Sequence, residues 1–307
     1  SPDLVWLKSR NHGHNPELYS TALGATIMSM TSYANSDTTR SNGLTAFNSD
    51  GFSLGNSIYT NQSGLNFVSW NWNGSASGVS NSQGSITSTV YANPDAGFSI
   101  VKYTGNGSSS ATYGHGLGKT PKMVITKGVA GTNWLWAVYH EDGTGFTNYL
   151  RLNEETANTG NSNTWKSMSD TLIGIGSEGH VNYNTHQFTS YVFAEIEGYS
   201  AFGKYAGNSS TDGPFVYTGF RPAFVMYKKT NNGSGWEMRD NDRPQYNTVN
   251  LGLKANDALA EYSSGCDIDF LSNGFKLRTS DGGHNRSGDT YAYVAFAENP
   301  FKYANAR

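Results

Sequence analysis

One segment of this chain occurs twice, and its last part occurs three times. Residues 97–127 read GFSIVKYTGNGSSSATYGHGLGKTPKMVITK, and residues 202–229 read FGKYAGNSSTDGPFVYTGFRPAFVMYKK. The closing pattern of both, a proline followed by apolar residues and a lysine, also opens the chain as PDLVWLK at residues 2–8. Self-similarity at wide, regular spacing is typical of repeat architectures. The sequence therefore predicts a chain of three repeat units.

The repeated segment has the pattern of β-strands joined by tight turns. Apolar and polar side chains alternate from Phe98 to Tyr103, as they do in half-buried strands. Gly105-Asn-Gly107 follows, and glycine adopts the positive φ that a tight reversal needs. Pro121 begins the next apolar run, at a strand start where its missing N–H costs little. We therefore expect a strand, a hairpin loop and a second strand in each complete copy.

The repeats divide the chain into three units and a connector. The predicted boundaries are residues 1–73 for the first unit, 74–96 for a Gly/Ser/Asn-rich connector with one strand, 97–201 for the second unit and 202–307 for the third. The first unit begins at its PDLVW strand and lacks the YTGNG-type hairpin of the other two. Either the sequence is cut within a longer chain or a neighbouring subunit completes that sheet, and we favour the first explanation.

The composition favours an all-β fold. The chain has 19 Tyr, 15 Phe and 7 Trp, while only 15% of its 307 residues are charged. Aromatic residues are enriched in strands, and helical periodicity is confined to weak candidates near 22–30 and 255–261. We predict three tandem β-sandwich-like units of jelly-roll or lectin-like character, with a strand at Trp134–Tyr139 among them.

Charge and cysteine content exclude several classes of function. The net charge of -3 provides no basic surface for nucleic acid and no polybasic membrane patch. No apolar run is long enough to insert into a membrane. Cys266 is the single cysteine, so no intrachain disulfide forms, and we expect it to pack as a small apolar residue and not to act as a nucleophile.

Five segments together resemble a repeat module of tailed-bacteriophage structural proteins of the marine and cyanophage type. They are GSITSTVYANPDAGFSIVKYTGNG, PDLVWLKSR, FNSDGFSLG, DGPFVYTGFRPAFVMYKK and the terminal FAENPFKYANAR. The resemblance implies a virion surface protein, such as a tail fibre or receptor-binding protein, located outside the cell. It implies a homotrimer that contacts other virion proteins and a host-surface polysaccharide or receptor. It provides no set of catalytic residues to transfer to this chain.

Acidic residues and histidines offer only weak candidates for chemistry. Glu195 and Glu197, two apart on an expected strand, could act as a glycosidase pair, but the repeat places Pro300 opposite Glu197. His12 and His14 could bind a metal together with His115 or His140, yet their spacing does not supply three converging ligands. Calcium is the second cation that we consider, at Asp240-Asn-Asp242, Asp267-Ile-Asp269 or Asn48-Ser-Asp50-Gly51. We therefore expect no catalytic residue, no resident metal and no other cofactor.

Aromatic residues outside the strand alternation are the best candidates for binding. Sugars are recognised by flat aromatic faces together with polar loop groups. The candidates, all near Asn, Ser or Thr, are Trp165, Tyr33, Tyr59, Tyr183 and Tyr246. We assign Trp6, Trp72, Trp136 and Trp236 to the cores of the units.

We therefore expect a non-enzymatic phage protein that binds host-surface glycans. Two alternatives remain. One is an architectural spacer or capsid-decoration protein without ligand specificity. The other is a polysaccharide depolymerase or glycosidase built on a β-sandwich. The sequence also leaves open whether three units in one chain replace the trimer by a monomer with pseudo-threefold symmetry.

Overall fold

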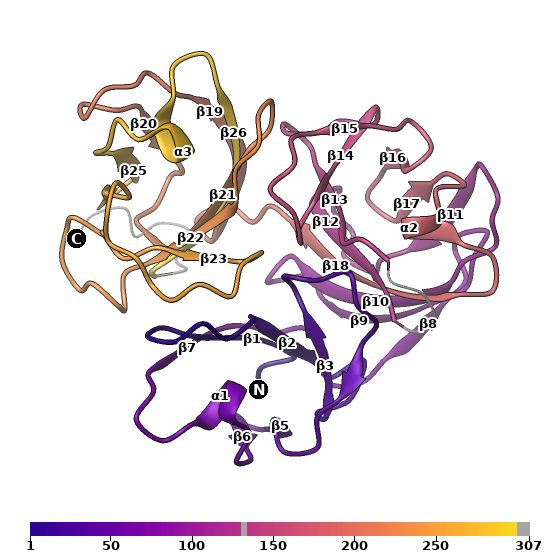
Figure 1. The fold of residues 1–307 in the computed structure, drawn as a ribbon. Coiled ribbons are helices and arrows are strands. Elements are labelled where there is room, and N and C mark those ends of the chain that lie inside the picture. Colours follow the sequence, from indigo (N-terminus) through magenta and orange to yellow (C-terminus); the bar gives the residue numbers. More distant parts are fainter. Residues whose placement is uncertain (130–133, 300–307) are drawn as a thin grey trace.

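The computed structural model describes residues 1–129 and 134–299 and is built almost entirely of antiparallel strands (Figure 1). Three larger sheets dominate. The first has the order β4-β3-β2-β1-β7, the third has the order β19-β26-β21-β22-β23, and the second has eight strands ordered β15-β14-β13-β12-β18-β10-β9-β8. The predicted all-β, sandwich-type fold is confirmed. The terminal segment FKYANAR of the sequence resemblance lies outside the described residues.

The strands of the larger sheets have the following bounds. In the first sheet they are β1 Leu4–Ser9, β2 Glu17–Ser20, β3 Ile27–Met30, β4 Thr38–Thr39 and β7 Phe67–Trp72. In the second they are β8 Val79–Asn81, β9 Ser88–Asn93, β10 Phe98–Thr104, β12 Pro121–Gly128, β13 Ala137–His140, β14 Asn148–Arg151, β15 Thr159–Gly160 and β18 Gln187–Ala194. In the third they are β19 Ser200–Ala206, β21 Pro222–Lys229, β22 Trp236–Asp240, β23 Leu253–Lys254 and β26 Thr290–Ala297.

Three small sheets and three single-turn helices complete the described structure. The small sheets consist of β5 Leu44–Asn48 with β6 Gly51–Leu54, of β11 Ala111–Gly114, β17 Leu172–Ile175 and β16 Trp165–Met168, and of β20 Phe215–Tyr217, β25 Gly274–Leu277 and β24 Ile268–Leu271. The helices are α1 Ile58–Asn61, α2 Gly179–Asn182 and α3 Gly282–Asn285. The helices expected near 22–30 and 255–261 are wrong: the first segment holds β3, and no helix is found in the second.

Each larger sheet buries both of its faces. In β1, Leu4 and Trp6 point to a core shared by all three sheets, whereas Val5 and Leu7 pack with Leu44 of the small β5–β6 sheet. Strand residues alternate between faces, so a strand that is apolar on both is sandwiched between two layers. Strands β12 and β21 divide their side chains between the shared core and a local core in the same way.

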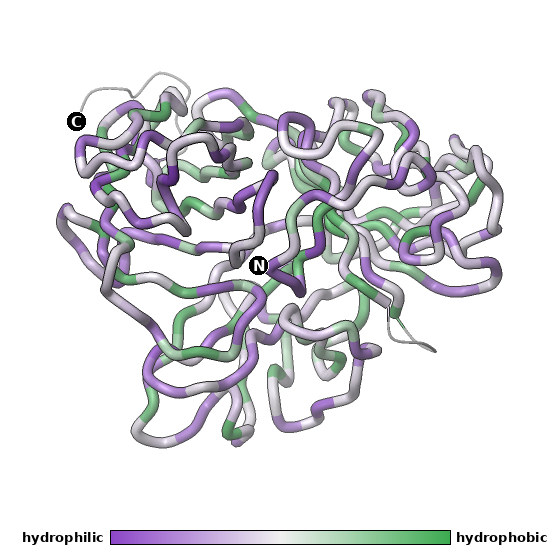
Figure 2. The backbone as a smooth tube through the Cα atoms, turned by 45° about the horizontal axis from the view of Figure 1, so that its top comes forward, coloured by the Kyte–Doolittle hydropathy of each residue, from purple (hydrophilic) through white to green (hydrophobic). Residues whose placement is uncertain are grey.

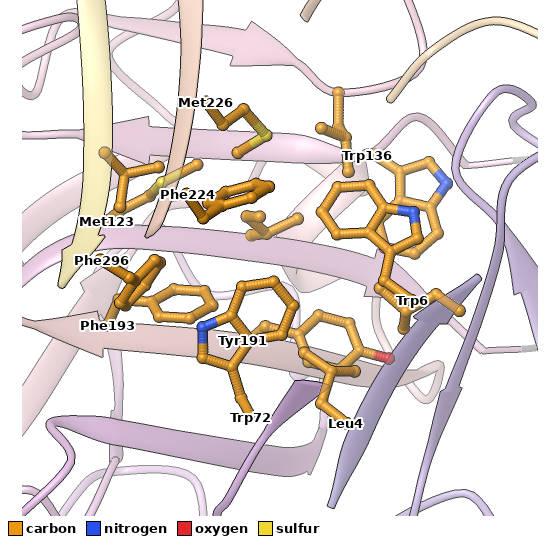
Figure 3. A pocket seen from close by; sticks show the side chains of 14 residues that line it. Leu4, Trp6, Trp72, Met123, Trp136, Tyr191, Phe193, Phe224, Met226 and Phe296 are labelled. Carbon is orange, nitrogen blue, oxygen red and sulfur yellow. The ribbon is translucent and has the colours of Figure 1, made fainter. Parts of the chain in front are cut away.

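The shared core lies where the three lobes meet (Figure 1), and apolar backbone segments run into this region (Figure 2). Trp72 is its centre: its ring packs edge-on against Phe193, Phe224 and Phe296 at centroid distances of 6.1, 6.0 and 5.6 Å. The close-up view shows these rings converging on one apolar pocket (Figure 3). The four core tryptophans are therefore buried as expected, but in one shared core instead of three separate ones.

The three larger sheets share a strand order. In each sheet, one strand directly follows a short helix: β7 after α1, β18 after α2 and β26 after α3. This strand pairs with the strand that begins near a proline, β1, β12 or β21, which in turn pairs with β2, β13 or β22. Strands β18 and β26 lie inside their sheets, whereas β7 is the last strand of its sheet among the described residues. The repeat units and their boundaries stay a prediction from the sequence, and we use "unit" below for the predicted segments.

Candidate functional site

Trp165, the predicted exposed tryptophan, is buried. It begins β16, its exposed fraction is 0%, and its ring packs edge-on against Tyr139 at 6.1 Å. It belongs to the local core of the second unit. The expectation of an exposed site here is wrong, because a strand of only four residues shows too little alternation to be recognised in a polar stretch.

Tyr33 and Tyr246 are exposed, at 49% and 82%, but they stand apart from other rings. Neither makes an aromatic contact within the described part of the chain. The carbonyl oxygen of Tyr33 accepts a hydrogen bond from the Trp136 indole, so the backbone of this residue has a structural role. The loop after Tyr246 is fixed by Asn247, whose side chain bonds the backbone N–H and carbonyl of Phe270. Single tyrosines of this kind offer little surface to a ligand.

Tyr183 lies in a surface cluster of rings. Its ring, 50% exposed, is 5.2 Å from Trp134 and 4.6 Å from His186, and it is perpendicular to His186. Trp134 also contacts His180 edge-on at 5.7 Å. We name these four residues, Trp134, His180, Tyr183 and His186, the aromatic corner.

The backbone around α2 holds the aromatic corner in place. Lys127 at the end of β12 donates a hydrogen bond to the carbonyl oxygen of Trp134 over 2.7 Å. Gly179 packs so closely on the Trp134 ring that a Cβ there would lie 3.1 Å from it. Asn182 is buried and bonds to the loop after β10, which fixes the end of α2 directly before Tyr183. The cluster therefore stands on a rigid base.

Burial affects the charge of one histidine in the aromatic corner. Burial lowers the pKa of His180, which favours the uncharged imidazole at pH 7. Glu178 lies 3.8 Å from His180 and also accepts a hydrogen bond from Asn161. The site thus combines exposed ring faces with neutral and polar hydrogen-bonding groups, which suits an uncharged polar ligand such as a sugar.

The first unit has a related cluster beside α1. The Tyr59 ring is 5.1 Å from His14, and the Arg40 guanidinium lies 4.3 Å from its centroid. His14 bonds to Gln62, and its ring lies against that of His12 at a centroid distance of 4.2 Å, tilted by 33°. Tyr59 is therefore covered by its own neighbours. In the third unit, Gly283 occupies the second position of α3, where α1 has Tyr59 and α2 has His180.

Trp134 and His186 were missed in the sequence, where Trp134 was placed on a core strand. Strand β13 begins only at Ala137, so Trp134 precedes it. The repeat contained the information: Trp236 aligns with Trp136, and Ser234 stands at the position of Trp134. A core position rarely holds tryptophan in one unit and serine in another, because the size change would leave a large cavity.

The described residues contain no group of three His, Cys, Asp or Glu side chains that could hold a metal ion. His115 and His140 are buried in separate places, against the carbonyl oxygens of Ser169 and Tyr293. Asp240 pairs with Arg243, and Asp269 pairs with Arg278. Neither aspartate converges with other carboxylates on a common point, so a calcium site has no support from this geometry.

Glu195 and Glu197 lie beyond the end of β18, not on a strand. The Glu195 carboxylate accepts a hydrogen bond from the backbone N–H of Phe202 over 3.1 Å, which fixes the connection to β19. Cys266 is buried and donates to the carbonyl oxygen of Asn250, and burial raises the pKa of its thiol. These contacts give the Glu195 carboxylate and the Cys266 thiol structural roles.

One family profile matches residues 1–300, and its description is "Domain of unknown function (DUF7483)". The chain belongs to this family. No match was found among the curated proteins or among the solved structures. In the part of the chain that the structure describes, no helix has the length and apolar character needed to cross a bilayer.

Proposed function

We propose that this protein is a non-enzymatic structural component of a bacteriophage particle that binds glycans on the host surface through the aromatic corner. The phage assignment rests on the sequence resemblance. The glycan assignment rests on one observation, the contact of the half-exposed Tyr183 ring with Trp134 and His186 at the surface.

The aromatic corner provides what a sugar needs. A pyranose presents a C–H face that packs on an aromatic ring, and its hydroxyl groups need donors and acceptors at the rim. Tyr183 and Trp134 supply ring faces, while His186 and Asn184 supply polar groups beside them. The buried side chain of Asn182 fixes the backbone beneath the aromatic corner through its hydrogen bonds. Binding therefore requires little ordering of the protein.

Binding to purified bacterial surface polysaccharides and to whole cells tests the proposal, with calcium and with chelator. We expect saturable binding to one polysaccharide class, with the polymer left intact. Tyr183→Ala should weaken binding by at least about tenfold, since loss of a stacked ring costs about 1.4 kcal/mol or more. Tyr246→Ala is the matched control, because that tyrosine is more exposed but stands alone.

Other outcomes point to the two alternatives. Absence of binding across a broad panel favours an architectural spacer or decoration protein. Release of new reducing ends, lost in Glu195→Gln, favours a depolymerase. Unchanged binding in Tyr183→Ala would place the glycan site elsewhere. Light scattering tests the expected homotrimer, whose mass is three times that of the chain, against a monomer in which three units of one chain share a core.

A further inference from the structure

Lys229 and Asp289 form a buried pair at one end of the third sheet. Lys229 is the last residue of β21, and Asp289 directly precedes β26, the neighbouring strand (Figure 1). The Nζ atom of Lys229 lies 2.9 Å from the Oδ2 atom of Asp289, and the two side chains are 6% and 4% exposed. Taking two charged groups out of water has a large desolvation cost, which their mutual attraction offsets only in part. An amide bond between the same side chains would remove both charges.

The other two larger sheets do not have this pair. The strand register identifies the corresponding positions: the last residue of the strand that begins near a proline, and the second residue before its aromatic partner on the next strand. At these two positions the first sheet has Ser9 and Leu65, and the second sheet has Gly128 and His186. The shared strand arrangement therefore needs neither a lysine nor a carboxylate here, and the third sheet has both together.

Hydrogen bonds hold both groups in place. The Lys229 ammonium group donates to the carbonyl oxygen of Gly282 over 2.6 Å. The side-chain amide of Asn232 donates to the Oδ1 atom of Asp289 over 2.5 Å. The backbone carbonyl oxygen of Asp289 accepts the N–H of Gly207 over 3.0 Å. The nitrogen and the carboxyl group are thus already positioned beside each other, which lowers the entropic barrier to a reaction between them.

We propose that Lys229 and Asp289 condense to an isopeptide bond that joins β21 to β26. One proton passes from the ammonium group to the carboxylate, and the neutral amine then attacks the carboxyl carbon of Asp289. The Nζ–Cγ bond forms and the Cγ–Oδ2 bond breaks, and Oδ2 leaves as water with two of the three ammonium protons. The ammonium and the carboxylate together contain every atom of the amide and the water, so the step needs no oxidant and no further reactant.

Asn232 is placed to stabilise the transition state of this step. Negative charge develops on Oδ1 when the amine attacks, and the Asn232 amide already donates to that atom. The first proton transfer is uphill, because burial raises the pKa of the Asp289 carboxyl but the hydrogen bonds from Lys229 and Asn232 lower it overall. We therefore expect a slow reaction that follows folding and does not accompany it.

The bond would close the part of the third unit that lies between the two residues. This part contains β22, β23, β24, β25 and α3. A cross-link of this kind restricts the unfolded chain and so stabilises the folded one, as a disulfide does. The chain has a single cysteine and forms no disulfide within itself. The inference is independent of glycan binding, since neither residue belongs to the aromatic corner.

The intact mass of the folded protein, followed during prolonged incubation, tests the proposal. We expect the mass to fall by about 18 Da, one water. Trypsin should then release a branched peptide that joins residues 229–239 to the peptide that begins at Ser287, with Lys229 left uncleaved. Full mass after incubation would overturn the proposal. Loss of water without the branched peptide would overturn it equally, because an aspartate before a glycine, such as Asp50, can lose water to form a succinimide.

Two variants separate the chemistry from the ion pair. Lys229→Arg keeps a positive charge beside Asp289, but its guanidinium stays protonated and does not attack, so the full mass should persist. Asn232→Ala removes the donor to Oδ1 and should slow the loss of water by at least about tenfold. Circular dichroism checks that both variants fold. Loss of water in Lys229→Arg at the original rate would contradict the proposed bond, and an unchanged rate in Asn232→Ala would overturn the role of Asn232.

Discussion

The ammonium group of Lys127 donates a hydrogen bond over 3.1 Å to the carbonyl oxygen of Ala34, which links the second unit to the first. The corresponding lysines repeat this link around the molecule. Lys8 of the first unit bonds to the carbonyl of Asp257 in the third, and Lys228 of the third bonds to that of Glu155 in the second. Each lysine also bonds to a carbonyl of its own unit, at His14, Trp134 or Ser234. The three units are thus tied in a closed ring of lysine contacts.

Lys127→Met should lower the free energy of unfolding by about 2 kcal/mol. Methionine keeps the apolar stem but leaves the buried carbonyl oxygens of Ala34 and Trp134 without this donor. Urea unfolding measures the loss, and hydrogen exchange should show faster opening near Ala34. Lys166→Met is the matched control, because Lys166 is exposed and its side chain, among the described residues, bonds to the nearby Asn163 alone. Equal stability of the two variants would show that the carbonyls find other partners at no cost.

Stability should rise as the pH increases from 8 toward 10. Burial lowers the pKa of Lys8, Lys127 and Lys228 to about 8, against 10.5 for an exposed lysine. Between these values the unfolded chain holds protons that the folded chain has released, so raising the pH favours the folded state. The gain is on the order of 1 kcal/mol for each lysine. Lys127→Met should remove about a third of it.

The rise should end near pH 10. Burial raises the pKa of Tyr113 to about 12 and that of Tyr191 further, so above pH 10 the unfolded chain loses phenolic protons that the folded chain retains. Stability then falls with pH. Urea titrations at about pH 7.5, 8.5, 9.5 and 10.5, which span the pKa ranges of the lysines and the tyrosines, measure both the rise and the fall of stability. A flat profile from pH 7.5 to 9.5 would contradict depressed lysine pKa values.

The strands could be predicted from the sequence because their patterns are local. Residues Leu4 to Leu7 lie in a strand as expected. The turn expected at Asp50-Gly51 is found one residue earlier, because Ser49 and Asp50 form the reversal between β5 and β6 and Gly51 already pairs with Asn48. The shared core could not be predicted with the same ease, since it depends on contacts between units. Yet LVWL is apolar at consecutive positions, and a strand with two apolar faces requires a covering layer on each.

The candidate site was predicted only in part. Tyr183 is exposed as expected, and its value as a binding residue stays a prediction. Trp165 and Trp134 exchanged roles: the first is in a core, and the second is at the surface beside α2. Polar residues precede both tryptophans in the sequence, so local pattern does not distinguish them. Only the tertiary fold decides which of the two rings is covered.

Asn182→Ala and Asn285→Ala should each destabilise the protein by about 2–3 kcal/mol, whereas Asn61→Ala should cost less than about 1 kcal/mol. All three asparagines end a short helix. Asn182 and Asn285 are fully buried, and each accepts the backbone N–H of the Gly-Asn loop and donates to two or more oxygens around it. Asn61 is exposed and bonds to the Gly55 carbonyl.

Urea unfolding of the three variants measures the difference, and the shared position in the helix makes Asn61→Ala a matched control. The helix end itself is perturbed equally in all three, so any excess loss in Asn182→Ala and Asn285→Ala comes from the loop contacts. The asymmetry follows from burial: an alanine at either buried position leaves polar backbone groups without partners or water, while water replaces the side chain at the exposed one. Similar losses in all three variants would mean that the Asn61 side chain also satisfies buried backbone groups.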